Sequence, residues 1–271
     1  MSLTENRGAK IYWDEQGQGE PVLLIMGLGW SSNMWHRTRP VLAAHYRTIT
    51  FDNRGAGRSD VSPGPYTMEM LASDAGAVLD AAGVERVHLL GISMGGMIAQ
   101  EFVLQYPDRV RSLILGCTAA GGPRAVQADA DAIQLLFRRD SNPEQRAKAA
   151  VPFIYDSGTP RERIDQDLAV LSEWYPNAEG YMAQLQGILA WEADSRLSHI
   201  TAPTLVIHGE NDRLVPAANG RLIAERIPSA RLVMLRNASH IFMTDQPAAA
   251  HHALLEFLSG RQEKYSAIGE S

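Results

Sequence analysis

Ser93 is the residue whose surroundings most favour nucleophilic chemistry. Gly91 and Gly95 stand two residues to either side of it, at positions where a sharp turn brings backbone against backbone. The apolar run 87–90 before it is typical of a buried strand, and apolar residues at helical spacing follow it. Gly-x-Ser-x-Gly between a strand and a helix is the pattern of a nucleophile elbow, which raises the serine hydroxyl above a sheet. We therefore predict that Ser93 is a catalytic nucleophile.

Two other interpretations compete with this prediction. A serine at the start of a helix is often only an N-cap. Glycine-rich turns after strands also bind dinucleotides, but Gly91, Gly95 and Gly96 do not have the Gly-x-Gly-x-x-Gly spacing, so we expect no pyrophosphate site. The elbow is favoured because suitable partners for a serine nucleophile occur later in the chain.

Asp212 and His240 are the candidate partners. A serine hydroxyl becomes a good nucleophile when a histidine takes its proton and a carboxylate orients that histidine. Both residues follow apolar runs that are typical of strands, and they give the chain order serine, acid, histidine. Two acids compete with Asp212. Glu210 lies too close to the end of its strand, and Asp245 follows the histidine and begins the last predicted helix, where it suits an N-cap.

The other seven histidines are less suitable as the base. His88 and His208 lie inside strand runs, and His251 and His252 lie on the last predicted helix, so packing or a surface position is their expected role. The remaining three, His36, His45 and His199, precede the acid in the chain.

Two backbone amides are expected to stabilise the charge that develops on an attacked carbonyl oxygen. Met94 N–H lies at the first turn of the helix after Ser93, where a free donor and the helix dipole favour an oxyanion. A glycine-rich loop, 27–32, follows the apolar run 21–26, and Leu28 N–H is the expected second donor unless this loop is only a turn. Apolar walls for a substrate are expected from Trp30, Met97, Trp191 and Ile241.

The elements that must position these residues alternate between strand and helix. Continuous apolar runs are typical of parallel strands that are covered on both faces. Strands are predicted at 9–15, as a first edge strand, and at 21–26, 46–51, 87–92, 111–117, 204–209 and 230–235; helices are predicted at 66–82, after Ser93, at 216–226 and at 246–258. Between them, Asp52 and Arg54 are expected to hold the polar loop 52–60 by charge-assisted hydrogen bonds rather than to do chemistry.

A helical insertion interrupts this alternation. From 124 to about 196 the chain has helical spacing, broken at proline-containing turns, and no clear strand pattern. We therefore predict a core made of residues 1–122 and 198–271, with a helical cap at 123–197. The aromatic residues of the insertion are expected to be mostly buried.

Composition narrows the classes of function. The chain has 271 residues, 45% of them hydrophobic, a formal net charge of −6 and one cysteine. Negative charge argues against nucleic acid as a partner, and one cysteine excludes an internal disulfide and a multi-cysteine zinc site. No apolar run approaches the length of a membrane span, and residues 1–7 lack the apolar segment of a signal peptide, so we expect a cytoplasmic protein without membrane partners. We also expect no metal or cofactor.

Four motifs together resemble the α/β-hydrolase superfamily: residues 91–96, 52–59 and 203–212, and the pair Ser239-His240. The resemblance implies a mostly parallel eight-stranded sheet with a helical cap between the sixth and seventh strands. Residues 95–100 and 117–120 look like those of 3-oxoadipate enol-lactonases and related esterases. Met26 departs from the pattern, because many members have histidine there, and a histidine side chain would hydrogen-bond to the oxyanion loop.

The expected activity is cofactor-free hydrolysis of a small carboxylic ester or lactone through an acyl-enzyme. Carbon–carbon bond hydrolysis and perhydrolysis on the same triad are alternatives, as is a ligand-binding receptor in which hydrolysis is vestigial. The natural substrate and the oligomeric state are not indicated by the sequence.

Overall fold

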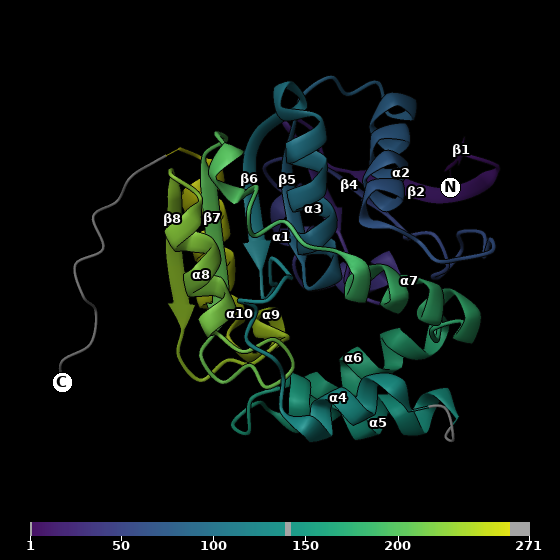
Figure 1. Ribbon diagram of the computed structural model, residues 1–271, viewed down its shortest axis with the longest axis vertical. Helices are drawn as coiled ribbons and strands as arrows, with labels where there is room; N and C mark the ends of the chain where they lie inside the picture. Colours follow the sequence, from purple (N-terminus) through teal and green to yellow (C-terminus); the bar gives the residue numbers. More distant parts are fainter. Residues whose placement is uncertain (1, 139–141, 261–271) are drawn as a thin grey trace.

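A twisted eight-stranded sheet forms the centre of the computed structural model, which describes residues 2–138 and 142–260 (Figure 1). The strand order is β1-β2-β4-β3-β5-β6-β7-β8. The strands are β1 (Ser2–Asn6), β2 (Ala9–Gln16), β3 (Pro21–Ile25), β4 (Arg47–Phe51), β5 (Val87–Ile92), β6 (Val110–Gly116), β7 (Thr204–Gly209) and β8 (Ala230–Leu235). The pairs β1–β2 and β2–β4 are antiparallel and all other neighbours are parallel, so the prediction of a mostly parallel eight-stranded sheet is confirmed.

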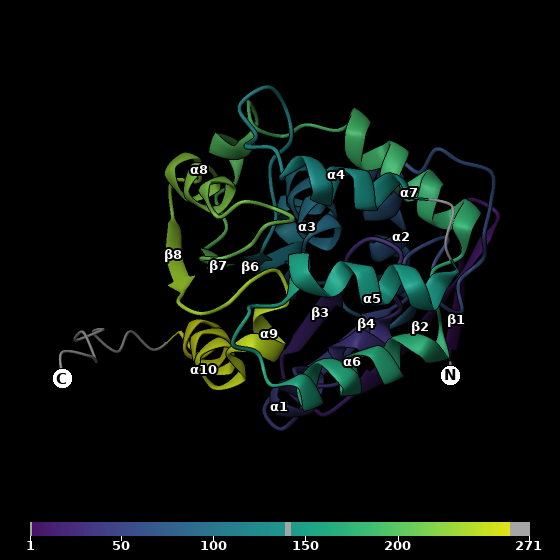
Figure 2. The ribbon, with the colours of Figure 1, turned by 90° about the horizontal axis from the view of Figure 1, so that it is seen from below.

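Helices cover both faces of the sheet (Figure 2). One face packs against α2 (Met68–Ala81), α3 (Met94–Gln105) and α8 (Ala218–Arg226), and the other against α1 (Arg39–Ala43) and α10 (Pro247–Leu258). Successive strand residues enter opposite layers of the core: Leu23 and Leu89 belong to the first, Leu24 and Leu90 to the second. This alternation explains why the central strands are mainly apolar. None of the helices in the described ranges is long and apolar enough to cross a membrane.

The edge of the sheet differs from the prediction. The strand predicted at 9–15 is present as β2, but its predicted place at the edge is wrong, because β1 pairs with β2 and forms the edge. The two strands are joined at Arg7 and Gly8, whose φ angles of 47° and 74° are those of a tight hairpin turn. Alternate residues of β1 are exposed, so its sequence lacks a long apolar run.

In the described residues between β6 and β7 the chain forms four α-helices: α4 (Ala130–Phe137), α5 (Pro143–Ile154), α6 (Arg161–Glu173) and α7 (Ala178–Ala190). Helices α4, α5 and α6 lie beyond the carboxyl ends of the strands (Figure 1). The chain leaves and re-enters the core at one place, where Ala193 N–H donates to Ala120 O. The expectation that the aromatic residues of this insertion are mostly buried is wrong for Phe137 and Trp174, which are 44% and 40% exposed.

The polar loop after β4 has the structural role that was predicted. Arg54 is buried and its guanidinium binds both carboxylate oxygens of Asp74 on α2, at 2.9 and 2.6 Å. Asp52 accepts hydrogen bonds from the backbone and hydroxyl of Ser32 and forms an ion pair with Arg58. These bonds fix the loop close to the carboxyl ends of β3 and β4.

The described chain also contains the short helix α9 (Phe242–Asp245) and the 3₁₀ turns η1 (Ser32–Trp35), η2 (Pro107–Arg109) and η3 (Leu197–His199).

Candidate active site

Ser93 occupies a strained turn between β5 and α3. Its φ and ψ are 54° and −124°, a conformation that a residue with a side chain rarely adopts. The turn is possible because its flanking glycines touch other backbone: a Cβ on Gly91 would overlap Gly95 O, and a Cβ on Gly95 would overlap Ile25 O. Packing on both sides therefore holds the serine at the corner.

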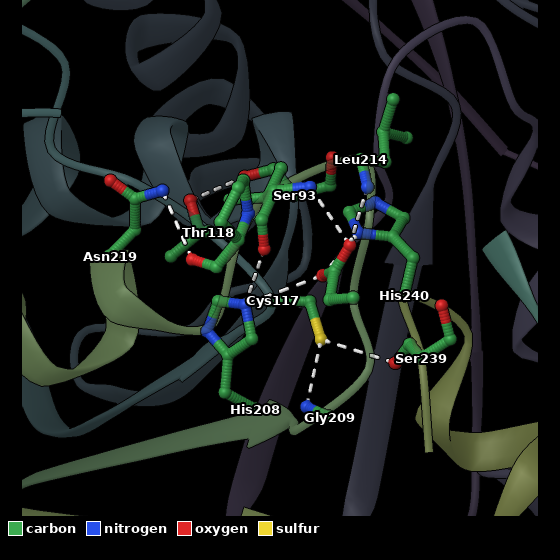
Figure 3. A network of polar contacts seen from close by, with 12 residues as sticks. Ser93, Cys117, Thr118, His208, Gly209, Leu214, Asn219, Ser239 and His240 are labelled. Atoms are coloured by element: carbon green, nitrogen blue, oxygen red, sulfur yellow. Dashed lines mark hydrogen bonds and ion pairs between the residues drawn. The ribbon is translucent and has the colours of Figure 1, made fainter. Parts of the chain in front are cut away.

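Asp212 and His240 are brought together from the loops after β7 and β8. His240 Nδ1 donates to Asp212 Oδ2 at 2.8 Å, and both residues are buried (Figure 3). The other carboxylate oxygen, Oδ1, accepts the N–H groups of Leu214 and Val215 at 2.9 and 2.8 Å. Since Nδ1 carries a proton toward the carboxylate, Nε2 of the neutral ring has a free lone pair that can accept one.

His208 is a second histidine on the same carboxylate, which the sequence analysis assigned to packing or surface. Its Nε2 lies 3.3 Å from Asp212 Oδ2 and 2.8 Å from Val215 O, and both of these atoms are acceptors, so Nε2 carries the hydrogen (Figure 3). A signal for this contact was present, since His208 precedes Asp212 by four residues at the end of a strand. The contact was not predicted because His208 lies within the apolar run of a strand, where a packing role was expected.

The charge state of Asp212 follows from these contacts. Burial alone would raise the pKa of its carboxyl, but the charge of His240 and hydrogen bonds from His208 and His240 outweigh burial and lower the pKa well below its usual value. Asp212 is therefore an anion across the neutral range, as an orienting carboxylate must be.

The two competing acids have other roles. Glu210 is exposed. Asp245 does not cap the last helix, and that part of the prediction is wrong: it ends α9, and its carboxylate accepts Ser239 N–H at 2.7 Å and the Thr159 hydroxyl. Asp245 thus ties the loop that carries His240 to the insertion.

Ser93 and His240 line the same cavity, which has a volume of about 890 Å³. In the described part of the chain, no direct hydrogen bond joins the Ser93 hydroxyl to the His240 ring. Contacts of this kind commonly shorten only with a substrate in place. The shared cavity would allow both groups to reach one bound molecule.

The loop after β3 runs beside Ser93. A Cβ on Gly27 would lie 3.2 Å from Ser93 Cβ, so the backbone there approaches the serine closely. Within the described ranges, neither Leu28 N–H nor Met94 N–H donates to another group, and both residues line the cavity. These two amides are thus available to an oxyanion.

The walls of the cavity are mainly apolar. The four residues expected to contact a substrate, Trp30, Met97, Trp191 and Ile241, all line it. The buried Trp191 ring is held by a hydrogen bond from its Nε1 to Glu101 Oε2 at 2.8 Å. Most other lining residues come from the insertion, so the insertion sets the shape of the cavity.

Cys117 adjoins the acid and the histidine. One potential ligand atom from each of Cys117, Asp212 and His240 lies within 4.8 Å of the others. Burial raises the pKa of the Cys117 thiol well above its usual value, and the oxygens of Asp212 already accept hydrogen bonds. The thiol is therefore protonated, and a protonated thiol is a poor metal ligand.

A family model described as the alpha/beta hydrolase fold matches residues 20–247. A protein from Azorhizobium caulinodans, named provisionally as the carbamate hydrolase RutD, is 34% identical over 95% of this chain and 98% of the relative. The 3-oxoadipate enol-lactonase 2 of Acinetobacter baylyi is 33% identical over 88% of this chain and 89% of its own length. The solved enol-lactonase from Burkholderia xenovorans LB400 has a TM-score of 0.84 at 27% identity, covering 95% of this chain and 100% of that chain. The similarity therefore spans both the sheet and the insertion.

Proposed function

Because the chain belongs to the α/β-hydrolase superfamily, we propose that it is a serine hydrolase that cleaves a small carboxylic ester or lactone. The observation that carries this proposal is the buried Asp212–His240 hydrogen bond at a cavity that Ser93 also lines. The family and its named relatives support hydrolysis in general. The serine mechanism and the ester class are our inference from the residues at the cavity.

In the proposed mechanism, Ser93 Oγ attacks the substrate carbonyl and His240 Nε2 accepts the hydroxyl proton. Asp212 orients the ring and stabilises its positive charge. The N–H groups of Leu28 and Met94 bind the oxyanion of the tetrahedral intermediate. The intermediate collapses when His240 returns the proton to the leaving alkoxide, and water, activated by His240 in the same way, releases the acid and restores Ser93.

We further propose that residues 123–197 act as a cap over the core formed by 1–122 and 198–271. The cap would select substrates by shape. This selection would be weak, because one methylene more or less in an apolar pocket changes the free energy by only about 1–3 kcal/mol. Several esters should therefore be accepted.

A carbamate is the second candidate substrate, supported by the 34% identity to the relative from Azorhizobium caulinodans. Its carbonyl carbon can be attacked by a serine in the same way as that of an ester, so the residues at the cavity suit both. Comparing kcat/KM for matched ester, lactone and carbamate substrates would separate them. A vinylogous diketone and a peroxide-dependent assay would test carbon–carbon hydrolysis and perhydrolysis.

Labelling with a fluorophosphonate, followed by mapping of the modified peptide, tests the mechanism directly. The expected result is a single adduct on Ser93. An adduct elsewhere, or none, contradicts the proposal. Labelling at Ser93 combined with turnover well below about 1 s⁻¹ on every substrate, against an enzyme median near 10 s⁻¹, would instead favour a receptor with vestigial hydrolysis.

A further inference from the structure

Gln184, in helix α7 of the insertion, holds the loop that carries Leu28 N–H, and we propose that it is a positioning residue for the reaction. The proposal rests on the proposed function, because it concerns one of the two oxyanion donors assigned there. It gives the insertion a part in the chemistry as well as in substrate selection.

Both polar atoms of the Gln184 side chain are hydrogen-bonded, and the side chain is buried. Its side chain has no exposed surface. Oε1 accepts the N–H of Gly29 at 2.7 Å, and Nε2 donates to Arg54 O at 2.7 Å. One amide side chain therefore joins the loop after β3 to the loop after β4, from a helix 155 residues away from Gly29 in the sequence.

The position of these bonds in the loop is what links Gln184 to the oxyanion. Leu28 N–H belongs to the peptide unit between Gly27 and Leu28. The unit after it is held by Gln184 through Gly29 N–H, and the unit before it is held by Asn53, whose Nδ2 donates to Met26 O at 2.8 Å. The donor peptide thus lies between two anchored peptides, one fixed by the core and one by the insertion.

Helix α7 is itself fixed rigidly enough to serve as an anchor. A Cβ on Gly180 would overlap Gly55 O, so the helix backbone lies directly on the loop after β4. Farther along, Tyr66 N–H donates to Ala183 O at 3.0 Å. Contacts between backbone atoms cannot relax by side-chain rotation, so the place of Gln184 relative to Ser93 is well defined.

Gln184→Met tests the proposal, because methionine has a similar length but makes neither hydrogen bond. The matched control is Gln186→Met, at an exposed position of the same helix that does not line the cavity. Rates on p-nitrophenyl acetate are normalised to the active sites titrated with a fluorophosphonate. Removal of an oxyanion donor costs about 10²–10³-fold in kcat, so displacement of one should cost roughly 10- to 100-fold, with KM nearly unchanged.

Binding of an alkylboronic acid, which forms a tetrahedral adduct with serine, gives a second readout. Its inhibition constant should rise by about the same factor as kcat falls, whereas a residue that only stabilises the fold would change the titrated fraction and not this constant. Gln184→Glu keeps an oxygen that can accept Gly29 N–H and, when its carboxyl is protonated, an O–H that can donate to Arg54 O, so at a pH below the pKa of that carboxyl it should lose less activity than Gln184→Met. Amide hydrogen exchange of 26–31 should be faster in Gln184→Met and unchanged in Gln186→Met.

Unchanged kcat and boronate binding per titrated site in Gln184→Met would overturn the proposal, as would unchanged exchange at 26–31. Both outcomes leave the serine mechanism standing if the wild-type protein is labelled on Ser93. Failure of the wild-type protein to be labelled would overturn both proposals together.

Discussion

Helices α3 and α5 are both 12 residues long, and the difference between them separates two regions of the molecule. In α3, which begins directly after Ser93, ten residues are buried, whereas in α5 of the insertion only Ile154 is. The helix that follows the candidate nucleophile is thus surrounded by core, and the helix that lines the cavity is mostly half-buried. Core packing therefore holds the helix behind the candidate nucleophile, whereas α5 gives the cavity a wall that is only partly buried.

The insertion is nevertheless tied to the core at a few buried polar points. In α6, Asp167 accepts hydrogen bonds from Arg37 and Thr244, at 2.9 and 2.6 Å, and lies 2.9 Å from a ring nitrogen of His36. In α7, Gln184 contacts two core loops. These anchors lie where the insertion faces the core. Variants in the buried core around Ser93, Asp212 and His240 should therefore lower turnover most. Variants in the part of the insertion that lines the cavity should instead change selectivity between substrates.

Ser93→Ala should have the largest effect. Without the hydroxyl no acyl-enzyme can form, so turnover should fall on the order of 10⁴-fold or more while the fold is retained. Ester hydrolysis and circular dichroism check the two halves of this prediction. The control is Ser172→Ala, at an exposed position of α6. Retained activity in Ser93→Ala would mean that the turn between β5 and α3 does not supply the nucleophile.

Asp212→Asn should be the next most damaging change. An amide can present N–H to His240 in place of an acceptor and so favour the wrong tautomer, which should lower kcat on the order of 10²–10⁴-fold. Glu210→Gln, two residues away and exposed, is the matched control and should stay close to wild type. If Glu210→Gln proved the more harmful of the pair, the acid would be misassigned.

Asp245 tests the tie between the two regions through pH. Burial raises the pKa of its carboxyl to about 6, although hydrogen bonds from the Thr159 hydroxyl and Ser239 N–H oppose this. The folded protein then holds this proton to higher pH than the unfolded chain does, so this carboxyl's contribution to stability falls as pH rises from about 4 to about 6.

Asp245→Asn cannot titrate. Its free energy of unfolding relative to wild type should therefore improve by roughly 1–3 kcal/mol between pH 4 and pH 7. Urea unfolding at both pH values measures the difference, with Asp108→Asn, at an exposed position, as the control. A difference that does not change with pH would show that Asp245 is ionised throughout.

The smallest effect is expected in the wall. Leu168 lines the cavity from α6, and Leu168→Ala should shift the preferred acyl length upward, changing kcat/KM for longer esters a few-fold and leaving p-nitrophenyl acetate almost unaffected. An acyl-length series on the variant and on Leu3→Ala, an exposed position on β1, makes the measurement. A large loss of kcat/KM for p-nitrophenyl acetate would show that Leu168 supports the reaction itself and not only the choice of substrate.

Much of the sheet and the candidate site could be predicted because their signals are local. Strands β7 and β8 have the predicted bounds, and the elbow at Ser93 is encoded by two glycines beside it. The places of Leu28 and Met94 at the cavity that Ser93 lines follow from their positions just after a strand and at the start of a helix, and their role as oxyanion donors stays a prediction. β1 could not be predicted with the same rule, because a half-exposed edge strand of five residues has no apolar run.

By itself, the sequence determined the turn at Ser93, the order of serine, acid and histidine, and the alternation that builds a parallel sheet. Only the tertiary structure decided that His208 shares Asp212, that Asp245 holds the histidine loop, and that Gln184 reaches Gly29. The physical reason is range: periodicity and turn chemistry act over a few neighbouring residues, whereas a side-chain hydrogen bond such as that between Gln184 and Gly29, 155 residues apart, depends on how the whole chain packs.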